Sequence, residues 1–228
     1  MRLVGGFRIS LVLLWFTLLL VAGPFSSCSV LAAPITFVDN YTWGFYNDSL
    51  GTVLDHTSPF NGTFLFPCAD CADGDPTINP APEPDLSVAD SILGQWLDKP
   101  PILNANWSGP QLIPSAWAIN TETAIIYEIG AGTSGIWDVV ANIGVDNGVF
   151  VWLDGNYQFG ALQPGYAVEW EYSFPLPDMG PGTHYLQILR EDHGTSSGFT
   201  IQVIGVPEPA TLLLLALGGL TLLRNRKG

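Results

Sequence analysis

Basic residues are scarce in this 228-residue chain, which has seven Lys and Arg against 21 Asp and Glu. The central part, residues 33–205, keeps two basic and 20 acidic residues, a net charge near −18. Such a charge repels phosphate groups and argues against a nucleic acid partner. The other five basic residues lie in the end segments: Arg2, Arg8, Arg224, Arg226 and Lys227.

Cysteine is nearly as rare, with three residues at Cys28, Cys68 and Cys71. The last two stand in Pro-Cys-Ala-Asp-Cys among turn-forming residues, and we expect them to form a structural disulfide in an oxidising compartment. A redox site would need a helix starting at the first cysteine, and zinc would need two further ligands at suitable spacing. Both alternatives stay open but are weaker.

Catalytic and metal motifs are also missing. No Gly-x-Ser-x-Gly nucleophile elbow occurs in the sequence. The acidic loop residues Asp70, Asp73 and Asp75 are followed by no glutamate at the twelfth position of an EF-hand. They remain a weak candidate for Ca²⁺ binding, because Asp beside Gly and Pro is usually a turn residue.

What the chain does have is a three-part tail. Val206, Pro207, Glu208 and Pro209 precede an apolar run at 210–223, and the basic residues Arg224, Arg226 and Lys227 follow it. A 14-residue helix of this run reaches about 21 Å, short of a hydrocarbon core of about 30 Å. Counting in residues 206–209 nearly closes the gap. The cations favour the cytoplasmic side, which predicts that everything before Val206 lies outside.

This tail resembles the PEP-CTERM sorting signal of Gram-negative bacteria, also catalogued as an ice-binding-protein C-terminal domain. The resemblance implies an exosortase partner, cleavage near Pro207-Glu208-Pro209, and delivery to the cell surface or an extracellular polysaccharide matrix. It says where the protein goes and nothing of its activity.

The N-terminus has the layout of a secretory signal peptide over residues 1–32. Arg2 and Arg8 precede an apolar run at 9–22, and Val30 and Ala32 occupy the small-residue positions before the predicted cleavage. A lipoprotein signal ending at Cys28 is an alternative, although Phe25 replaces the aliphatic residue of that pattern. Both segments together predict an exported chain with residues 33–205 as one domain and 206–228 as its sorting signal.

The central domain has the sequence pattern of an all-β fold. Short β-branched and aromatic runs recur at about 10-residue intervals between turn residues, which predicts an antiparallel β-sandwich or jelly roll. Asp146-Asn147-Gly148 and Asp154-Gly155-Asn156 are expected as hairpin turns. The expected strands are 35–38, 41–46, 63–66, 124–129, 136–145, 149–153, 157–159, 167–174, 184–190 and 199–204.

Two segments interrupt the strand pattern. Residues 67–85, which include Cys68 and Cys71, are rich in Pro, Asp and Gly and predict an exposed loop. Residues 86–98 follow with Leu86, Ala89 and Leu93 at helical spacing, and Pro100 stops the pattern. We expect one short helix there.

Residues 144–204 resemble lectin-like, protective-antigen-type sandwich domains. The likeness lies in Asp146-Asn147-Gly148, in the Val-Trp-Leu-Asp-Gly strand at 151–155, and in Gly182-Thr-His-Tyr-Leu. In sugar-binding members the acidic hairpin helps to hold Ca²⁺, which implicates Asp146 and Asn147, with Asp192 as a further candidate. Asn147 stands where many binders have a second Asp, which weakens that expectation.

Candidate sites for sugars come from aromatic and paired acidic residues. Trp43, Trp107 and Trp117 stand beside turn residues, where an exposed ring could stack on a sugar. Glu169 and Glu171 would share one face of a strand, as glycoside hydrolysis needs, although a solvated outer face explains them more simply. We therefore expect a non-catalytic surface or matrix protein that binds extracellular polysaccharide. A purely structural matrix protein and a glycoside hydrolase are the alternatives.

Overall fold

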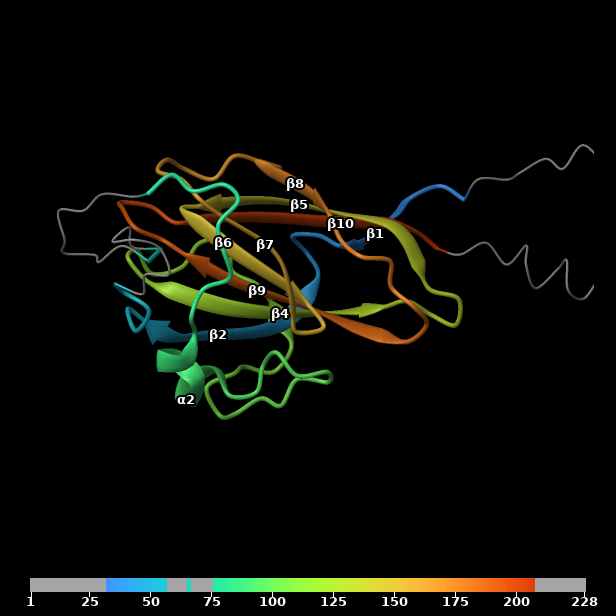
Figure 1. Cartoon of the computed structure of the whole chain (residues 1–228), viewed down its shortest axis with the longest axis horizontal. Helices are drawn as coiled ribbons and strands as arrows, with labels where there is room; N and C mark the ends of the chain where they lie inside the picture. Colours follow the sequence, from blue (N-terminus) through green and yellow to red (C-terminus); the bar gives the residue numbers. More distant parts are fainter. Residues whose placement is uncertain (1–31, 57–64, 67–75, 208–228) are drawn as a thin grey trace, which may run out of the picture. The chain divides into compact units, whose positions relative to one another are not determined.

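The structure is a computed structural model that describes residues 32–56, 65–66 and 76–207. In these ranges the chain forms two antiparallel β-sheets that pack face to face (Figure 1). The expected all-β sandwich is confirmed. No helix within the described ranges is long and apolar enough to cross a membrane.

The smaller sheet has four strands in the order β1-β10-β5-β8. Its long strands β5 and β10 pair over most of their length, and β1 and β8 flank them. The strands are β1 (Ile35–Val38), β5 (Ile136–Asp146), β8 (Tyr172–Pro175) and β10 (Gly198–Pro207).

The larger sheet has six strands in the order β3-β2-β4-β9-β6-β7. β4 and β9 pair along their full lengths at its centre, and the two-residue strand β3 closes one edge. The strands are β2 (Trp43–Gly51), β3 (Gln111–Leu112), β4 (Glu122–Gly130), β6 (Gly148–Leu153), β7 (Asn156–Leu162) and β9 (Thr183–Glu191).

Both faces of the larger sheet are covered, as β4 illustrates. Side chains alternate between the two faces of a strand. Ile125, Tyr127 and Ile129 therefore face the smaller sheet and join the core between the sheets. Ala124 and Ile126 face the other way into a second core, formed with the segments that precede β3. Burial on both faces explains why β4 is apolar almost throughout.

The second core is built around tryptophans. The Trp96 ring lies 5.9 Å from Trp107 and 5.4 Å from Trp152, centroid to centroid. The helix expected at 86–98 is shorter than predicted, since a 3-10 turn (Ser87–Ala89) and α2 (Asp90–Leu93) end at Gly94. Gly94 has a φ of 64° and a ψ of −153°, a conformation that favours glycine and ends the helix. Because the helix ends before Trp96, this side chain does not follow the helical spacing, and it packs in the second core.

One of the two expected hairpins is confirmed. Asp154 and Gly155 form a two-residue loop between the paired residues Leu153 and Asn156, with φ values of 51° and 76°. Positive φ at both positions is the geometry of a type I′ turn, which suits the twist of two paired strands.

The hairpin expected at Asp146-Asn147-Gly148 is wrong. Asp146 pairs with Gly198 of the smaller sheet, whereas Gly148 pairs with Glu191 and Leu162 of the larger one. Asn147 therefore carries the chain from one sheet to the other. A β-carbon on Gly148 would lie 2.8 Å from the Glu191 side chain, so glycine is needed here for close packing.

The strand expected at 167–174 begins later than predicted. Residues 169–170 form a turn, Trp170 has a φ of 58°, and β8 starts at Tyr172. Residues 76–85 form no strand, although Ile78 makes one isolated bridge to Leu162. These residues form a loop as expected, but the loop is not exposed throughout, because Ala81 is buried in the second core.

Candidate functional site

A row of side chains crosses the outer face of the larger sheet at the beginning of β2. Glu128 of β4 pairs with Tyr185 of β9. Phe45 of β2 pairs with Ile126 at the end of the β2–β4 ladder, and continuing that register by two residues would bring Trp43 opposite Glu128. Because Phe45 and Tyr185 pack against the second core, this row lies on the outer face.

The row combines aromatic surface with one carboxylate. Trp43 is 63% exposed and Glu128 is also exposed, whereas Phe45 and Tyr185 are half-buried. Neighbouring strands are about 4.8 Å apart, so Trp43 and Tyr185 leave the sheet about 10 Å from each other with Glu128 between them. An aromatic platform of this kind can stack on a ligand while the carboxylate accepts its hydrogen bonds.

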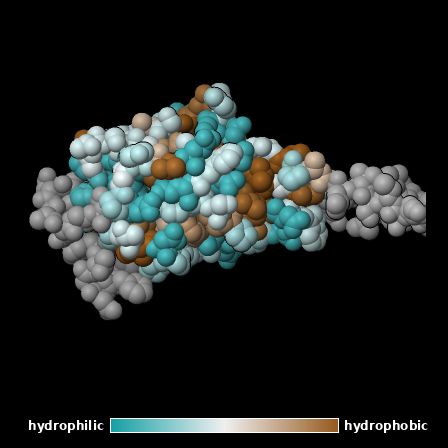
Figure 2. Space-filling model, turned by 90° about the horizontal axis from the view of Figure 1, so that it is seen from above, coloured by the Kyte–Doolittle hydropathy of each residue, from teal (hydrophilic) through white to brown (hydrophobic). Residues whose placement is uncertain are grey.

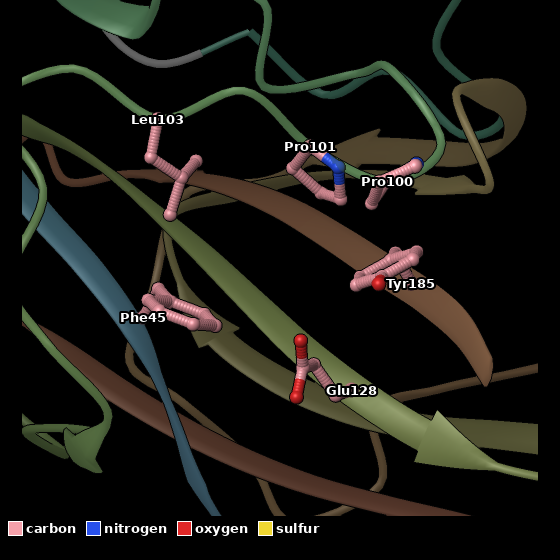
Figure 3. Close-up of a pocket in the computed structure, with 6 residues that line it drawn as sticks. All are labelled: Phe45, Pro100, Pro101, Leu103, Glu128 and Tyr185. Carbon is pink, nitrogen blue, oxygen red and sulfur yellow. The ribbon is translucent and has the colours of Figure 1, made fainter.

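A shallow pocket of about 80 Å³ adjoins the row (Figure 3). Its floor comes from three adjacent strands and its wall from the loop that follows α2. Two consecutive prolines make that wall stiff, because each fixes its own φ angle. The lining residues are Phe45, Glu128 and Tyr185 from the sheet and Pro100, Pro101 and Leu103 from the loop.

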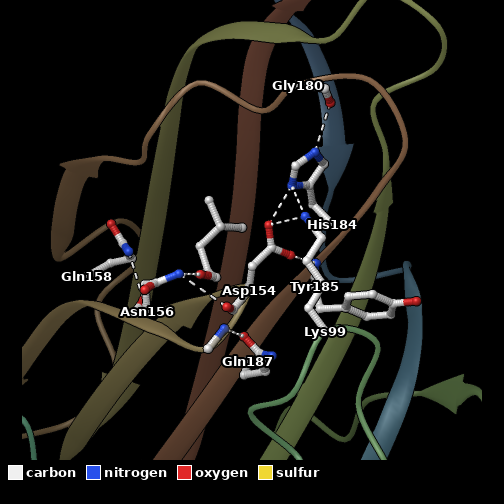
Figure 4. Close-up of polar contacts among 10 residues, drawn as sticks. Lys99, Asp154, Asn156, Gln158, Gly180, His184, Tyr185 and Gln187 are labelled. Atoms are coloured by element: carbon white, nitrogen blue, oxygen red, sulfur yellow. Dashed lines mark hydrogen bonds and ion pairs between the residues drawn. The ribbon is translucent and has the colours of Figure 1, made fainter.

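A polar clamp ties this loop to the sheet (Figure 4). Lys99 Nζ donates to Asp154 Oδ2 at 2.6 Å. The same oxygen lies 2.6 Å from His184 Nδ1, and the backbone N–H of Tyr185 donates to Asp154 Oδ1 at 2.9 Å. Since Lys99 directly precedes Pro100, the clamp sets the position of the pocket wall.

Asp154 is suited to its place in the clamp. Burial raises the pKa of its carboxyl, but the hydrogen bonds from Lys99, Tyr185 and His184 outweigh burial and hold the pKa below the ordinary 3.8. Asp154 is therefore ionised at neutral pH and attracts the Lys99 ammonium.

His184 makes structural contacts through its ring nitrogens. Its Nε2 lies 2.8 Å from the carbonyl oxygen of Gly180. Its Nδ1 contacts Asp154 and lies 3.2 Å from Lys99 Nζ. Both ring nitrogens of His184 are therefore in contact with neighbouring protein atoms.

Of the three tryptophans expected to stack on a ligand, the structure places one in this site. Trp107 is buried, and its Nε1 donates to the carbonyl of Leu93. Trp117 packs over the Arg190 guanidinium at 4.1 Å, and its Nε1 donates to the Thr121 carbonyl. These two residues stabilise the fold, whereas Trp43 is open to solvent.

The candidate Ca²⁺ ligands Asp146, Asn147 and Asp192 lie at the corner where β5 leads into β6, and all three are buried. Asn147 Oδ1 accepts from His193 N–H at 2.7 Å, and Asp192 Oδ2 accepts from Asn120 N–H at 2.6 Å. Within residues 32–56, 65–66 and 76–207, no three His, Cys, Asp or Glu side chains form a group that could hold a metal ion. Ca²⁺ binding stays a prediction without structural support.

The two carboxylates considered for hydrolysis do not share a strand face. Glu169 lies in the turn at 169–170, and Glu171 precedes the first residue of β8. Burial, with the nearby charge of Asp146 acting in the same direction, raises the pKa of Glu171. The strand geometry on which the hydrolase alternative depended is therefore wrong.

Several predicted residues lie outside the described ranges. They comprise the signal peptide, the proposed disulfide, the acidic loop residues and most of the sorting tail: residues 1–31, Cys68, Cys71, Asp70, Asp73, Asp75, Glu208, Pro209, Arg224, Arg226, Lys227 and the apolar run at 210–223. Val206 and Pro207 are described, and they end β10.

Comparison with known proteins identifies the tail. Residues 205–227 match the PEP-CTERM protein-sorting motif. The chain carries a PEP-CTERM sorting motif. This tail implies an exported, membrane-anchored precursor that an exosortase sorts to the cell surface.

The curated proteins contain no match to this sequence. Among solved structures, a β-glucuronidase from an uncultured Clostridium sp. is similar with a TM-score of 0.41 and 10% identity over 78% of this chain. The chain spans 30% of the length of that protein, and so distant a likeness carries no argument about function.

Sequence reasoning found Trp43 but missed Phe45, Glu128 and Tyr185. A signal was present, since Glu128 is the charged residue within the apolar strand at 124–129, and Phe45 follows Trp43 by the two-residue period of a strand face. What sequence lacked was the register that brings these strands together.

Proposed function

We propose that this protein is an exported, non-catalytic surface or matrix component that binds extracellular polysaccharide across the outer face of its larger sheet. The observation that carries the proposal is the row of Trp43, Glu128 and Tyr185 beside the proline-walled pocket. Its sorting tail would deliver this face to the polysaccharide outside the cell.

The shape of the site suits a polymer. A pocket that buries a small ligand usually holds about 300–1,000 Å³, whereas this one holds about 80 Å³. A sugar chain lying across the sheet would stack on Trp43 and Tyr185 and place one residue over the pocket. Hydroxyl groups of that residue could donate to Glu128, which is an acceptor when ionised.

The charge of the domain narrows the ligand class. Residues 33–205 carry a net charge near −18, and Glu128 puts one negative charge in the site itself. Polysaccharides rich in uronic acid or phosphate would be repelled, so we expect a neutral or amino-sugar polymer.

The site supports binding better than hydrolysis. Glycoside hydrolases use two carboxyl groups about 5–9.5 Å apart, and the pocket lining holds one, Glu128. The nearby Asp154 accepts hydrogen bonds from Lys99 and Tyr185. These contacts favour a structural role for Asp154.

Glycan-array binding followed by calorimetry tests the proposal. We expect Trp43→Ala and Tyr185→Ala each to weaken polysaccharide binding at least about 10-fold, since each ring contributes on the order of 1–3 kcal/mol by stacking and burial. Trp170→Ala removes a ring of similar exposure, 51%, outside the site and should bind like the wild type.

Two results would overturn the binding proposal. One is absence of binding to any neutral or amino-sugar glycan, with or without Ca²⁺, which favours a purely structural matrix protein. The other is polysaccharide cleavage that Glu128→Gln abolishes. Sorting is tested separately: the intact mass of the surface form should lack Arg224, Arg226 and Lys227.

A further inference from the structure

The sorting motif starts inside the folded domain. Its matched region begins at residue 205, whereas β10 continues to Pro207. Val206 pairs with Trp137 and Pro207 with Ile136, both on β5. The first residues of the motif are therefore held in the smaller sheet, and the domain ends only a few residues before the apolar run.

The connection to the apolar run is short. Three residue steps separate Pro207 from Ala210, and an extended chain covers at most about 3.6 Å per step. The end of β10 thus lies within about 11 Å of the start of the run. This distance is close to the depth of one headgroup layer. Half the difference between the total and the hydrocarbon thickness of a bilayer puts that depth at about 5–8 Å.

The short length of the apolar segment also favours a position of the domain close to the membrane. Because β10 uses Val206 and Pro207, these residues cannot lengthen a membrane helix as the sequence suggested. Residues 208–223 leave at most 16 positions, or about 24 Å as a helix against a hydrocarbon core of about 30 Å. A span that is too short draws its flanking residues into the interface.

The end of the smaller sheet where β10 finishes exposes large apolar side chains. Trp137 and Ile35, each 47% exposed, lie beside Val206 and Gly205 in the sheet. Further along the same strands, the paired residues Asn142 and Gln202 make a polar surface instead. Figure 2 looks onto this sheet and shows hydrophobic surface gathered toward the end where β10 finishes.

We propose that this end of the smaller sheet, centred on Trp137 and Ile35, docks on the lipid headgroup interface while the precursor is anchored. Tryptophan favours this depth, because its ring is apolar and its N–H remains hydrated. Asp138 and Asp178 lie at the same end, joined by a hydrogen bond from Asp138 N–H, so the surface suits zwitterionic rather than anionic lipid.

Photo-crosslinking tests the docking. The full-length precursor is reconstituted in phosphatidylcholine vesicles with benzoylphenylalanine in place of Trp137 or, as the matched control, Trp170. The control has similar exposure, and it precedes β8 near the far end of β5, an 11-residue strand about 33 Å long. We expect a phosphatidylcholine adduct by mass spectrometry at position 137 and at least 5-fold less at position 170.

A longer connection tests the cause. Six Gly and Ser residues inserted between Glu208 and Pro209 should reduce the adduct at position 137 several-fold, because the domain is then free to leave the surface. Equal adducts at positions 137 and 170, or no adduct at 137 in a precursor that melts like the wild type, would overturn the proposal. An adduct that persists undiminished with the insertion would show that the short connection is not its cause.

Discussion

Lys99 Nζ and Asp154 Oδ2 lie 2.6 Å apart although 55 residues separate them in sequence. This ion pair joins the loop that walls the pocket to the turn between β6 and β7. The salt bridge is partly exposed, and exposed ion pairs contribute little to stability. Because it holds the pocket wall in place, it would shape the proposed binding surface.

Replacing Lys99 separates the effect of this ion pair on binding from its effect on stability. Lys99→Met keeps the aliphatic stem and removes the charge, so we expect binding of the polysaccharide to weaken about 3- to 10-fold as the wall loosens. The melting temperature should fall by no more than about 3 °C, since the pair is worth at most about 1 kcal/mol. A large loss of stability with unchanged binding per folded molecule would contradict this division.

The buried Glu122 makes stability depend on pH. Burial, with the nearby charge of Asp55 second, raises the pKa of Glu122 from 4.5 to about 9. Between these values the native state keeps a proton that the unfolded state has lost, so the free energy of unfolding falls as pH rises.

Glu122→Gln removes this titration. We expect the variant to exceed the wild type in free energy of unfolding by at least about 1 kcal/mol at pH 8, with a smaller difference at pH 5. Urea denaturation at both pH values measures it. As a control, Glu128→Gln removes an exposed carboxylate from the same strand and should not raise the free energy of unfolding. A Glu122→Gln variant that is less stable than the wild type at pH 8 would contradict the explanation.

Gly155 is required by both conformation and space. Its φ is 76°, and a β-carbon would lie within clash distance of the Leu97 carbonyl oxygen. Gly155→Ala should therefore cost more than Gly132→Ala, where φ is 63° but nothing lies within 4 Å. We expect about 1 kcal/mol for Gly132 from backbone strain and at least about 2 kcal/mol for Gly155. Equal losses in chemical denaturation would show that the contact with Leu97 is unimportant.

Arg190 is a buried cation enclosed by aromatic rings. Its guanidinium carbon lies 4.1 Å from the Trp117 ring centroid and 4.8 Å from that of Phe199, and its Nε donates to Thr123. Burial lowers its pKa to about 10, despite the opposing effect of Tyr46 and Tyr127.

Arg190→Ala should lower the free energy of unfolding by about 3 kcal/mol or more, because it leaves a cavity and unpaired acceptors. Arg190→Lys keeps the charge but loses the planar stacking, and we expect it to recover less than half of that loss. Thermal denaturation of the three proteins measures the difference. Full recovery by lysine would show that charge alone stabilises this part of the core.

The strand pattern was predictable because it depends on local chemistry. The two-residue period and the Asp-Gly turn at 154–155 predicted β6 and the hairpin that leads into β7, although β7 extends to Leu162, beyond the expected 157–159. The same chemistry failed at Asp146-Asn147-Gly148, where the glycine fits against Glu191 and Leu162 of the other sheet. A turn motif predicts that the chain changes direction, but it does not predict which sheet the next strand joins.

The candidate site was only partly predictable for a related reason. Trp43, Trp107 and Trp117 have similar surroundings in sequence, yet one is exposed, one is buried in the second core and one packs over Arg190. Exposure depends on which segments cover each sheet face. That cover comes from residues more than 40 positions away, such as the loop with Pro100 and Pro101 beside Phe45.

The sequence by itself identified the sorting motif, because the apolar run and terminal charges of the tail form one continuous segment. It also determined the all-β class, since strand periodicity is local. Only the tertiary structure decided that Trp43, Glu128 and Tyr185 form one surface, and that β10 holds the first residues of the sorting motif beside Trp137. Both depend on the register between strands distant in sequence, which long-range packing selects.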